Sequence, residues 1–462
     1  MIQSAMIGSL AQFAAACHGR LNGADRDFHE IAIDTRKLVP GNLFAALRGA
    51  HTDGHNFVGA AATAGAAGAL VQRLSDAPLA QILVVDVETA LAHAARSARA
   101  KFTGPVIGIA GSNGKTTVKE MLAAILSQRG PCLATCGNLN NQLGVPMTLL
   151  RLDATHRSAV IEMGANRRGD IEHLVRIARP DIGLITNAGA EHLEGFGSLE
   201  GAARAEGEII STLAASGIAV INADDTYAAL WRASTAARLC TFALHAEADY
   251  RAEGLQFEVG EQGFRSRFRL CSRAGGSVAV TLALAGRHNV YNALAAAAAA
   301  ASAGASLEQI ASGLAAMRAV KGRLQFHRTR HGAWLIDDSY NANPSSARAA
   351  LEVLGELPGR RWLVLGDMAE LGEFAEASHH EIGELARSQG IERLFSLGGL
   401  AALASARFGA GASHYEDVGE LTRALDAELS ADVRLLIKGS RVNRLERVVE
   451  AIAIPPHARK AG

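Results

Sequence analysis

The chain has few cysteines and no long apolar run. Its five cysteines are scattered without a Cys-x-x-Cys pair, so we expect neither a disulfide framework nor a zinc site. A reducing cytosol suits such a chain, and we expect a cytoplasmic protein. The most apolar stretch, residues 293–301, is nearly all alanine and too short to span a bilayer. The first residues lack a basic segment followed by a leucine-rich core, so we expect no secretory signal and no membrane insertion.

An excess of one charge is also absent. Lys plus Arg and Asp plus Glu each number 46, and no long basic run occurs. This balance gives no electrostatic reason to expect nucleic acid or an anionic membrane surface as a partner. The length is enough for about two to four domains with ample core. The function must therefore be inferred from motifs.

A glycine-rich turn between an apolar run and a helical pattern carries the first chemical signal. Residues 106–110 are apolar, the turn reads Gly-Ser-Asn-Gly-Lys-Thr-Thr, and helical spacing continues to about residue 128. Such a turn binds phosphate through backbone N–H groups, while Lys115 can reach a β- or γ-phosphate and Thr116 can ligate Mg²⁺. Because the strict motif has a further glycine where Ile109 stands, an ordinary tight turn remains the alternative. The expected nucleotide contacts are Gly111, Ser112, Asn113, Gly114, Lys115, Thr116 and Thr117.

Polar residues end three more apolar runs in the same region. Glu162, Asn187 and Asn222 each close such a run, and in open α/β sheets ligands bind beyond the carboxyl ends of the strands. Glu162 offers the oxygen ligand that a nucleotide-bound Mg²⁺ needs, with a helix-capping acid as the alternative. His192 lies in a loop after a strand end and is either a metal ligand or a structural histidine.

Three α/β units are expected along the chain. Residues 1–103 would form a small α/β domain. Residues 104–319 alternate strands with helices, which predicts a parallel sheet covered on both faces, with an antiparallel excursion over 249–284. Residues 320–462 would form an independent α/β domain. Strands are expected at 30–37, 43–47, 69–71, 158–161, 181–185, 217–221, 334–336, 362–365, 394–397 and 435–437, and a helix at 289–303.

Short motifs along nearly the whole chain, taken in order, resemble the Mur ligase family of peptidoglycan synthesis. The family also includes the folylpolyglutamate synthase type. Any one motif is weak, but their order is specific. The motifs are Asp34-Thr-Arg, Gly41-Asn-Leu-Phe44, Asp53-Gly-His55, the phosphate loop, Gly137-Asn-Leu-Asn-Asn-Gln-Leu-Gly-Val-Pro146, Glu162-Met-Gly-Ala-Asn166, His192-Leu-Glu-Gly-Phe-Gly197, Gly286-Arg-His-Asn-Val-Tyr-Asn292, Lys321-Gly-Arg323, Asp337-Asp-Ser-Tyr-Asn-Ala-Asn-Pro344, Gly366-Asp-Met-Ala-Glu-Leu-Gly372 and Lys438-Gly-Ser-Arg441.

The resemblance implies an α/β fold of three domains. A central P-loop domain with a doubly wound, mostly parallel sheet would be flanked by a small N-terminal α/β domain that binds the UDP end of the substrate. A C-terminal Rossmann-like α/β domain would bind the acceptor and close on ATP. The implied activity is ATP-dependent amide ligation through an acyl phosphate, forming ADP and phosphate. Within the family the chain resembles the members that add D-Ala-D-Ala to UDP-N-acetylmuramoyl-tripeptide, so these two molecules are the expected partners of a monomer.

The same resemblance implies roles for individual residues. The catalytic residues would be Lys115, His192, Glu206 and Arg323. ATP would contact the phosphate loop and, through adenine, ribose and phosphates, Asn289, Asn292, Asp338 and Arg323. Two Mg²⁺ ions would be bound, one by Thr116 and Glu162 and the other by Glu162 and His192. The substrates would contact Thr35, Arg36, Asn138, Asn140, Asn141, Asn341 and Asn343.

One departure from the family pattern concerns the second Mg²⁺. The family places a carbamylated lysine a short helix after the histidine, and its carbamate completes that metal site. Here Glu206 stands at that position, and no lysine occurs between Lys119 and Lys321 that could be carbamylated instead. Our hypothesis is that Glu206 supplies the negative charge directly, with a water bridging the gap that its shorter side chain leaves. The alternative is a solvated helix acid and a weakly bound second metal.

Two other functions stay open. Another Mur-type activity, such as addition of the third amino acid or polyglutamylation of folate, would use the same kind of site. A nucleotide-binding homologue without catalysis would keep the fold.

Overall fold

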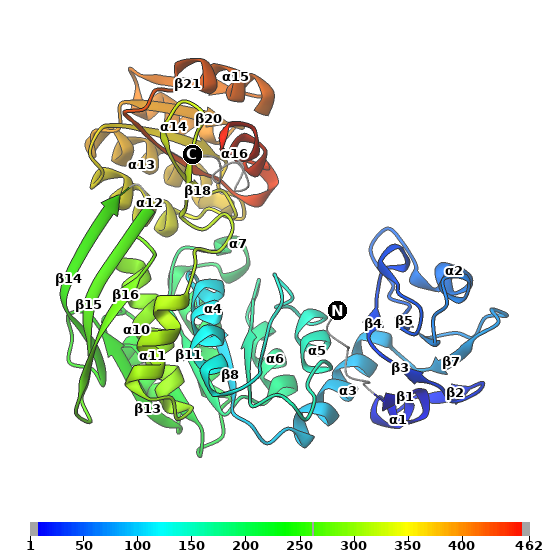
Figure 1. Cartoon of the computed structure of the whole chain (residues 1–462). Helices are drawn as coiled ribbons and strands as arrows, with labels where there is room; N and C mark the ends of the chain where they lie inside the picture. Colours follow the sequence, from blue (N-terminus) through cyan, green and yellow to red (C-terminus); the bar gives the residue numbers. More distant parts are fainter. Residues whose placement is uncertain (1–7, 261–262, 455–462) are drawn as a thin grey trace, which may run out of the picture.

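The computed structural model describes residues 8–260 and 263–454. Three large sheets follow one another along the chain, with five, nine and six strands. Figure 1 shows them as three bodies, the amino-terminal one in blue to one side of the central one and the carboxyl-terminal one in orange and red above it. Within the described ranges, no helix combines the length and apolarity needed to cross a membrane. The expected α/β class is confirmed.

The amino-terminal sheet has the order β2-β7-β6-β5-β4 and is parallel except at β2. The expected strands at 43–47 and 69–71 are present, but the expected strand over 30–37 is wrong beyond Ala32. There the Asp34 carboxylate accepts a hydrogen bond from Arg36 N at 3.0 Å and begins a 3-10 helix, because an aspartate can bond its own backbone in place of a strand partner. The strands are β2 (Arg20–Asn22), β4 (Ile31–Ala32), β5 (Leu43–Ala45), β6 (Gly68–Val71) and β7 (Ala80–Leu83), beside a separate pair β1 (Gly8–Ser9) and β3 (Asp27–Phe28).

The central sheet has the order β16-β15-β14-β13-β12-β11-β8-β10-β9. Strands β8 to β13 are mutually parallel, and β14 joins β13 in parallel before the antiparallel β15 and β16, as expected for residues 249–284. From β8 the chain runs to β9 and β10 on one side and then crosses to β11 on the other, so the strand order reverses at β8. Such a reversal opens a crevice at the carboxyl ends of the strands. The strands are β8 (Val106–Ala110), β9 (Cys132–Ala134), β10 (Ser158–Glu162), β11 (Ile182–Ile185), β12 (Ile218–Asn222), β13 (Arg238–Ala243), β14 (Tyr250–Gly260), β15 (Gly263–Ser272) and β16 (Ser277–Leu282).

Helices cover both faces of the central sheet (Figure 1). On one face α4, α10 and α11 pack together, and Ile107 and Ile109 of β8 point into their core. On the other face α3, α5, α6 and α8 pack over Val106 and Ala110, because successive strand residues face opposite sides. The alanines of α10 are buried along its length, which lets it approach the sheet closely. The helices are α3 (Val87–Lys101), α4 (Lys115–Leu126), α5 (Gly144–Leu149), α6 (Asp170–Ala178), α8 (Leu199–Ser211), α10 (Arg287–Ser302) and α11 (Leu307–Ala316).

The carboxyl-terminal sheet has the order β17-β18-β22-β19-β20-β21 and is parallel except at β17. Four of its strands match expected ones, whereas β17 and β21 were not expected. The strands are β17 (Gln325–Arg328), β18 (Trp334–Asp338), β19 (Arg360–Gly366), β20 (Arg393–Leu397), β21 (Ala412–Tyr415) and β22 (Val433–Lys438). Its helices are α12 (Pro344–Gly355), α13 (Ala375–Ser388), α14 (Ala401–Phe408), α15 (Val418–Glu428) and α16 (Glu446–Ile452).

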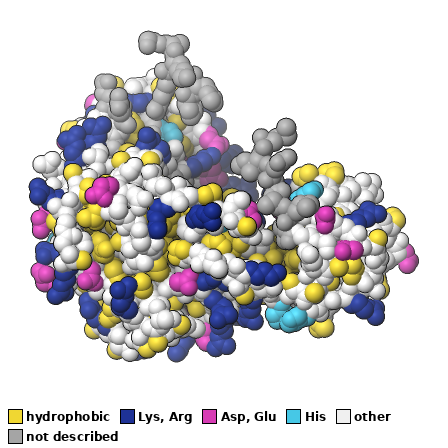
Figure 2. Space-filling view, turned by 60° about the horizontal axis from the view of Figure 1, so that its bottom comes forward, with side chains coloured by type: hydrophobic (Ala, Val, Ile, Leu, Met, Phe, Trp, Pro, Cys, Tyr) yellow, Lys and Arg dark blue, Asp and Glu magenta, His cyan; other side chains and the backbone are white. Residues whose placement is uncertain are grey.

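Shorter elements complete the described chain. Helix α7 lies against the 3-10 turn η4 of the carboxyl-terminal part, so these two parts touch. Figure 2 shows Lys, Arg, Asp and Glu side chains interspersed with apolar and uncharged ones on the face that it presents. The remaining elements are α1 (Leu10–Ala16), α2 (Val58–Thr63), α7 (Leu193–Phe196), α9 (Ala228–Ser234), η1 (Thr35–Lys37), η2 (Gly54–Phe57), η3 (Ser127–Arg129), η4 (Gly372–Phe374) and η5 (Arg441–Asn443).

Candidate active site

A cavity of about 570 Å³ lies where the carboxyl edge of the central sheet faces β18 and α12 of the carboxyl-terminal part. Most of the expected nucleotide-binding residues line it, together with acids and amides from the neighbouring strand ends. The expected residues in its wall are Ser112, Asn113, Gly114, Lys115, Thr116, Thr117, Glu162, Asn289, Asn292, Arg323, Asp338, Asn341 and Asn343. The cavity therefore joins the residues expected for ATP with two of those expected for substrate.

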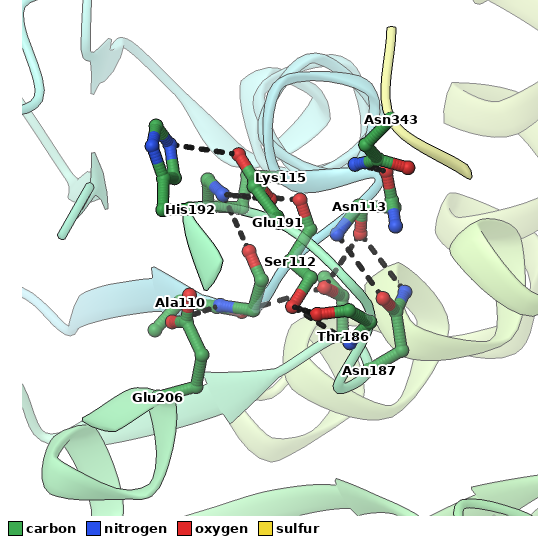
Figure 3. Close-up of polar contacts among 12 residues, drawn as sticks. Ala110, Ser112, Asn113, Lys115, Thr186, Asn187, Glu191, His192, Glu206 and Asn343 are labelled. Carbon is green, nitrogen blue, oxygen red and sulfur yellow. Dashed lines mark hydrogen bonds and ion pairs between the residues drawn. The ribbon is translucent and has the colours of Figure 1, made fainter. Parts of the chain in front are cut away.

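The phosphate loop is held in shape by the loop that follows β11. Thr186 Oγ1 donates to Asn113 O at 2.7 Å, and Asn187 exchanges hydrogen bonds with Asn113 at 3.0 and 3.1 Å (Figure 3). Gly114 has φ +85°, and a Cβ there would lie 2.2 Å from Asn292 Oδ1. Only glycine meets both demands at that position. The loop leads into α4, whose N-terminus faces the cavity, as a phosphate site requires.

Lys115 lies among three carboxylates. Its Nζ donates to Gly111 O at 2.5 Å and is 3.5 Å from Glu191 Oε2. Burial by itself lowers the pKa of Lys115, but the charges of Glu191, Glu206 and Glu162 outweigh burial and raise that pKa. The lysine is therefore a charged group whose positive end is surrounded by acids.

Glu162, at the end of β10, is 2% exposed. Its Oε1 accepts hydrogen bonds from Asn140 Nδ2 at 2.9 Å and from Thr116 Oγ1 at 3.2 Å. Its Oε2 is buried and has no hydrogen-bond partner; the nearest cation is Lys119 Nζ at 3.9 Å. A buried carboxylate oxygen without a donor lowers the stability of the folded state. A cation bound in the cavity would stabilise this atom.

Glu206 reaches the phosphate loop from α8 (Figure 3). It is 3% exposed, and its Oε2 accepts a hydrogen bond from Gly111 N at 2.6 Å. Burial raises the pKa of Glu206 to about 7, with Lys115 opposing the rise and Glu191 adding to it. Glu206 is therefore no solvated helix acid; it holds the first glycine of the loop.

His192 lies between two carboxylates. Its Nε2 is 3.3 Å from Glu191 Oε1, and its Nδ1 is 2.9 Å from Glu370 Oε2 of the carboxyl-terminal part. Burial lowers the pKa of His192, but Glu191 and Glu370 outweigh that effect, so the pKa is raised overall. The ring is therefore held in one orientation by acids from both parts of the chain.

The residues expected to hold the second metal do not converge. Among residues 8–260 and 263–454, no group of three or more His, Cys, Asp and Glu side chains is placed to hold a metal ion. Neither His192 nor Glu206 lines the cavity. His192 pairs with two acids, and Glu206 accepts a hydrogen bond from Gly111 N.

Contacts from the carboxyl-terminal part close over the phosphate loop. Arg323 donates to Thr116 Oγ1 at 3.1 Å, and its guanidinium lies 4.5 Å from the centre of the Tyr340 ring. Asn343 Nδ2 donates to Asn113 Oδ1 at 2.9 Å (Figure 3). A charged group and an amide of this part thus lie directly on the loop.

The asparagines expected to face adenine, at the start of α10, form part of the cavity wall. Asn289 and Asn292 are buried and joined by a hydrogen bond of 3.1 Å. Asp338, expected beside the ribose, lines the same cavity, but its Oδ2 pairs with Lys438 Nζ at 2.5 Å and its Oδ1 accepts from Leu324 N at 3.1 Å. A ribose hydroxyl that bonds to Asp338 would therefore be a further partner of a carboxylate already bonded to Lys438 and Leu324 N.

The other expected substrate residues lie outside the cavity. Thr35 and Arg36 are in the amino-terminal part, where Arg36 is 87% exposed and pairs with Asp34. Asn138 is exposed, and Asn141 Oδ1 accepts a hydrogen bond of 2.8 Å from Gly144 N, the first residue of α5. In the loop from 138 to 142, Asn140 bonds a carboxylate of the cavity wall.

Several residues of the site had no expected role, among them four titratable ones. Glu191 pairs with Lys115 and His192, Glu370 with His192, and Lys438 with Asp338. His288 lines the cavity, and burial lowers its pKa to about 4. The signal for Glu191 was present, since a glutamate directly before the candidate histidine must lie near the same strand end.

Comparisons with known proteins agree with this geometry. The model "Mur ligase family, catalytic domain" matches residues 27–100, "Mur ligase middle domain" matches 109–300, and "Mur ligase, glutamate ligase domain" matches 322–441. A UDP-N-acetylmuramoyl-tripeptide–D-alanyl-D-alanine ligase of Escherichia coli K12 is 44% identical over 448 residues, which are 96% of this chain and 98% of the relative. The chain belongs to the Mur ligase family. The resemblance drawn from the order of the motifs is thereby confirmed.

Solved Mur ligases share the arrangement of the whole chain. MurF from Acinetobacter baumannii superposes with a TM-score of 0.90 at 34% identity, covering 97% of this chain and 99% of that one. MurF from Thermotoga maritima, solved in complex with ADP, has a TM-score of 0.81 at 28% identity and covers 91% of this chain and 96% of that one. The expected three-domain Mur ligase architecture is confirmed.

Proposed function

We propose that this Mur ligase uses ATP to join D-Ala-D-Ala to UDP-N-acetylmuramoyl-tripeptide, a step in the synthesis of peptidoglycan precursors. The observation that carries the proposal is the meeting of Lys115 and Arg323, from different parts of the chain, around the phosphate loop at Thr116. The substrate pair is the one named for the Escherichia coli relative, which matches nearly end to end.

Each part of the chain takes one component of the reaction. We assign residues 1–103 to the UDP end of the substrate, 104–319 to ATP, and 320–462 to the D-Ala-D-Ala acceptor and to closure on ATP. Thr35 and Arg36 would then meet the UDP moiety. The amides of Asn138, Asn140, Asn141, Asn341 and Asn343 would meet the peptide substrates. The protein would act as a monomer in the cytoplasm.

The reaction proceeds in two displacements. A terminal carboxylate oxygen of the tripeptide attacks the γ-phosphorus of ATP, the bond to the β,γ-bridging oxygen breaks, and ADP leaves. The amine of D-Ala-D-Ala then attacks the carbonyl carbon of the acyl phosphate, loses a proton, and expels phosphate with the former carboxylate oxygen. Lys115 and Arg323 stabilise the negative charge on the transferring phosphoryl oxygens. Because Arg323 comes from the carboxyl-terminal part, closure of the parts completes the site.

The donors around the phosphate loop fit Mg²⁺. Mg²⁺ prefers carboxylate and hydroxyl oxygens, and Glu162 presents a buried Oε2 without a hydrogen-bond partner. Thr116 and Glu162 would hold one ion. The second ion expected at Glu162, His192 and Glu206 does not fit this arrangement, because His192 pairs with Glu191 and Glu370 and Glu206 accepts from Gly111 N. Bound at Thr116 and Glu162, the ion would neutralise phosphate charge and orient the phosphates. The chain's own task is to keep these donors fixed, which Asn140 does for Glu162 at 2.9 Å.

A coupled phosphate-release assay tests the function. We expect release only when ATP, UDP-N-acetylmuramoyl-tripeptide and D-Ala-D-Ala are all present. Single amino acids, or glutamate with a folate, should support rates at least about a hundredfold lower, since a site built for a dipeptide leaves polar groups unpaired with a shorter acceptor. Faster turnover with a single amino acid would establish another Mur-type activity, and nucleotide binding without turnover would establish a non-catalytic homologue.

A further inference from the structure

Glu370 belongs to the site, and the reaction above gives it no role. It lies just before the 3-10 turn η4 of the carboxyl-terminal part, and its Oε2 is 2.9 Å from His192 Nδ1. His192 precedes α7 of the central part, and α7 contacts η4. The His192 side chain is 20% exposed and that of Glu370 is 59% exposed. One carboxylate thus joins two parts of the chain that are far apart in the sequence.

Both residues of this pair have an unusual backbone conformation. The φ angle is +49° at His192 and +64° at Glu370, in the left-handed region that residues other than glycine rarely adopt. Leu324, next to Arg323, has φ +49° as well. Such conformations persist where the surrounding structure imposes them, and they are frequent at functional sites. Here they lie where the central and carboxyl-terminal parts meet.

The loop that carries His192 is packed between the phosphate loop and α12. On one side, Gly189 N donates to Ser112 Oγ at 2.8 Å. On the other side, Ala190 N donates to Ser345 Oγ of α12 at 3.3 Å. A Cβ on Gly189 would lie 3.0 Å from Ser345 Oγ and 3.3 Å from Ser112 Cβ, so the three segments are in close contact. The carboxyl-terminal part therefore docks on a loop that also bonds to the phosphate loop.

The two parts also touch at a second place. Strand β15 of the central sheet contacts β17 of the carboxyl-terminal sheet, and the rings of Phe264 and Phe326 meet edge-on there with their centres 5.9 Å apart. Figure 1 shows β15 and α7 at separate places below the carboxyl-terminal part. The chain itself enters the carboxyl-terminal sheet through β17, so this side stays attached when the parts separate. The contact between Glu370 and His192 lies away from this connection, where the parts are free to open.

Docking at the loop of His192 is linked to the chemistry through Arg323. Arg323 comes from the same part as Glu370 and donates to Thr116 Oγ1 at 3.1 Å. With its Nε2 facing Glu191 Oε1 at 3.3 Å, the His192 ring presents Nδ1 to Glu370. We propose that Glu370 is a positioning residue: its pairing with His192 holds the carboxyl-terminal part closed and keeps Arg323 at the phosphate loop. This inference rests on the proposed function, in which Arg323 stabilises the transferring phosphoryl group.

The ratio of closed to open chains tests the proposal without turnover. Single-molecule fluorescence energy transfer would follow the full chain, with dyes attached through non-natural amino acids at Ala215 and Ala410, which are exposed residues of the two parts. In the presence of β,γ-methylene ATP, Glu370→Gln should lower this ratio about fivefold, because a partly exposed ion pair contributes by this order. Glu373→Gln is the matched control and should leave the ratio within about twofold of the wild type. Glu373 is an exposed acid of η4 that forms no ion pair within the described chain.

Two further variants separate pairing with His192 from a general effect of charge. Glu370→Asp keeps the carboxylate on a shorter side chain, so its ratio should lie between those of Glu370→Gln and the wild type. In a chain that already carries His192→Gln, Glu370→Gln should have no further effect, because the two residues act as one pair. Thermal unfolding of each variant shows whether it is folded.

An unchanged ratio in Glu370→Gln would overturn the proposal. An equal loss with and without His192 would also overturn it, because Glu370 would then act through another group. A wild type that shows a single interdomain distance, with and without the nucleotide analogue, would do the same. The measurement needs no acceptor, so a wild type that closes as expected but does not turn over D-Ala-D-Ala would contradict the proposed function alone.

Discussion

Replacing Lys115 by methionine is expected to lower the rate of ATP-dependent phosphate release by about a thousandfold. Removing one preorganised charged donor from a phosphoryl-transfer site removes stabilisation that is specific to the transition state, which commonly costs 10²- to 10³-fold in kcat. Methionine keeps much of the length and apolar stem of lysine, so the loop loses the charge more than its packing. The measurement is steady-state phosphate release with both co-substrates present.

Loss of Lys115 also leaves acids without their cation. Glu191 pairs with its ammonium at 3.5 Å, so the pKa of Glu191, now lowered by Lys115 and His192 against the effect of burial, should rise in the variant. Lys115→Arg keeps the charge and tests this point. Lys101→Met, at the exposed end of α3, is the control and should leave the rate unchanged. A rate within about tenfold of wild type for Lys115→Met would show that Lys115 does not act on the phosphates.

Replacing Glu206 by glutamine is expected to change stability and metal dependence together. The pKa of Glu206 is raised from 4.5 to about 7 in the folded protein, so the folded state binds the proton more tightly than the unfolded state. The contribution of Glu206 to the free energy of unfolding, about 3 kcal/mol, is fully present below about pH 4.5. It is lost as the pH rises through about 7. Glutamine does not titrate. The unfolding temperature of the variant minus that of the wild type should therefore increase by a few degrees between pH 5 and pH 8.

Differential scanning fluorimetry without nucleotide or metal measures that change. A difference between variant and wild type that stays constant with pH would contradict the titration of Glu206. In activity assays, Glu206→Gln should need at least about tenfold more Mg²⁺ for half-maximal rate, because metal sites weaken by this order when a supporting group is lost. Added bicarbonate should not change the wild-type rate, since no lysine stands where a carbamate would form. An unchanged Mg²⁺ dependence would show that Glu206 serves only to hold the phosphate loop.

Strong periodicity made the central sheet predictable from sequence. Apolar runs of four or five residues predicted β10, β11 and β12, and the alanine-rich pattern predicted α10. Most of the strands that were missed, such as β17, β21 and β2, lie at or beside sheet edges, whereas β13, also missed, lies inside the central sheet. At these edges, exposed polar residues such as His414 interrupt the apolar pattern. The strand expected over 30–37 failed for a local reason, the hydrogen bond from Arg36 N to Asp34.

Site residues that belong to one local motif could be predicted from the sequence. Contacts between segments far apart in the sequence could not. The phosphate loop and Glu162 follow from strand ends and spacing. The pairing of His192 with Glu370 depends on the carboxyl-terminal part lying against α7, which no local pattern reveals. The bond from Gly111 N–H to Glu206 likewise depends on how α8 packs below β8. Tertiary packing therefore decides which acids surround Lys115.

Oxygen transfer from the substrate carboxylate to phosphate tests the account most directly. UDP-N-acetylmuramoyl-tripeptide labelled with ¹⁸O in its terminal carboxylate would be turned over with ATP and D-Ala-D-Ala, and the released phosphate analysed by mass spectrometry. The account predicts that each phosphate carries one ¹⁸O, because the carboxylate oxygen that attacks the γ-phosphorus leaves with it. Phosphate without label, or equal phosphate release without D-Ala-D-Ala, would contradict ligation through an acyl phosphate.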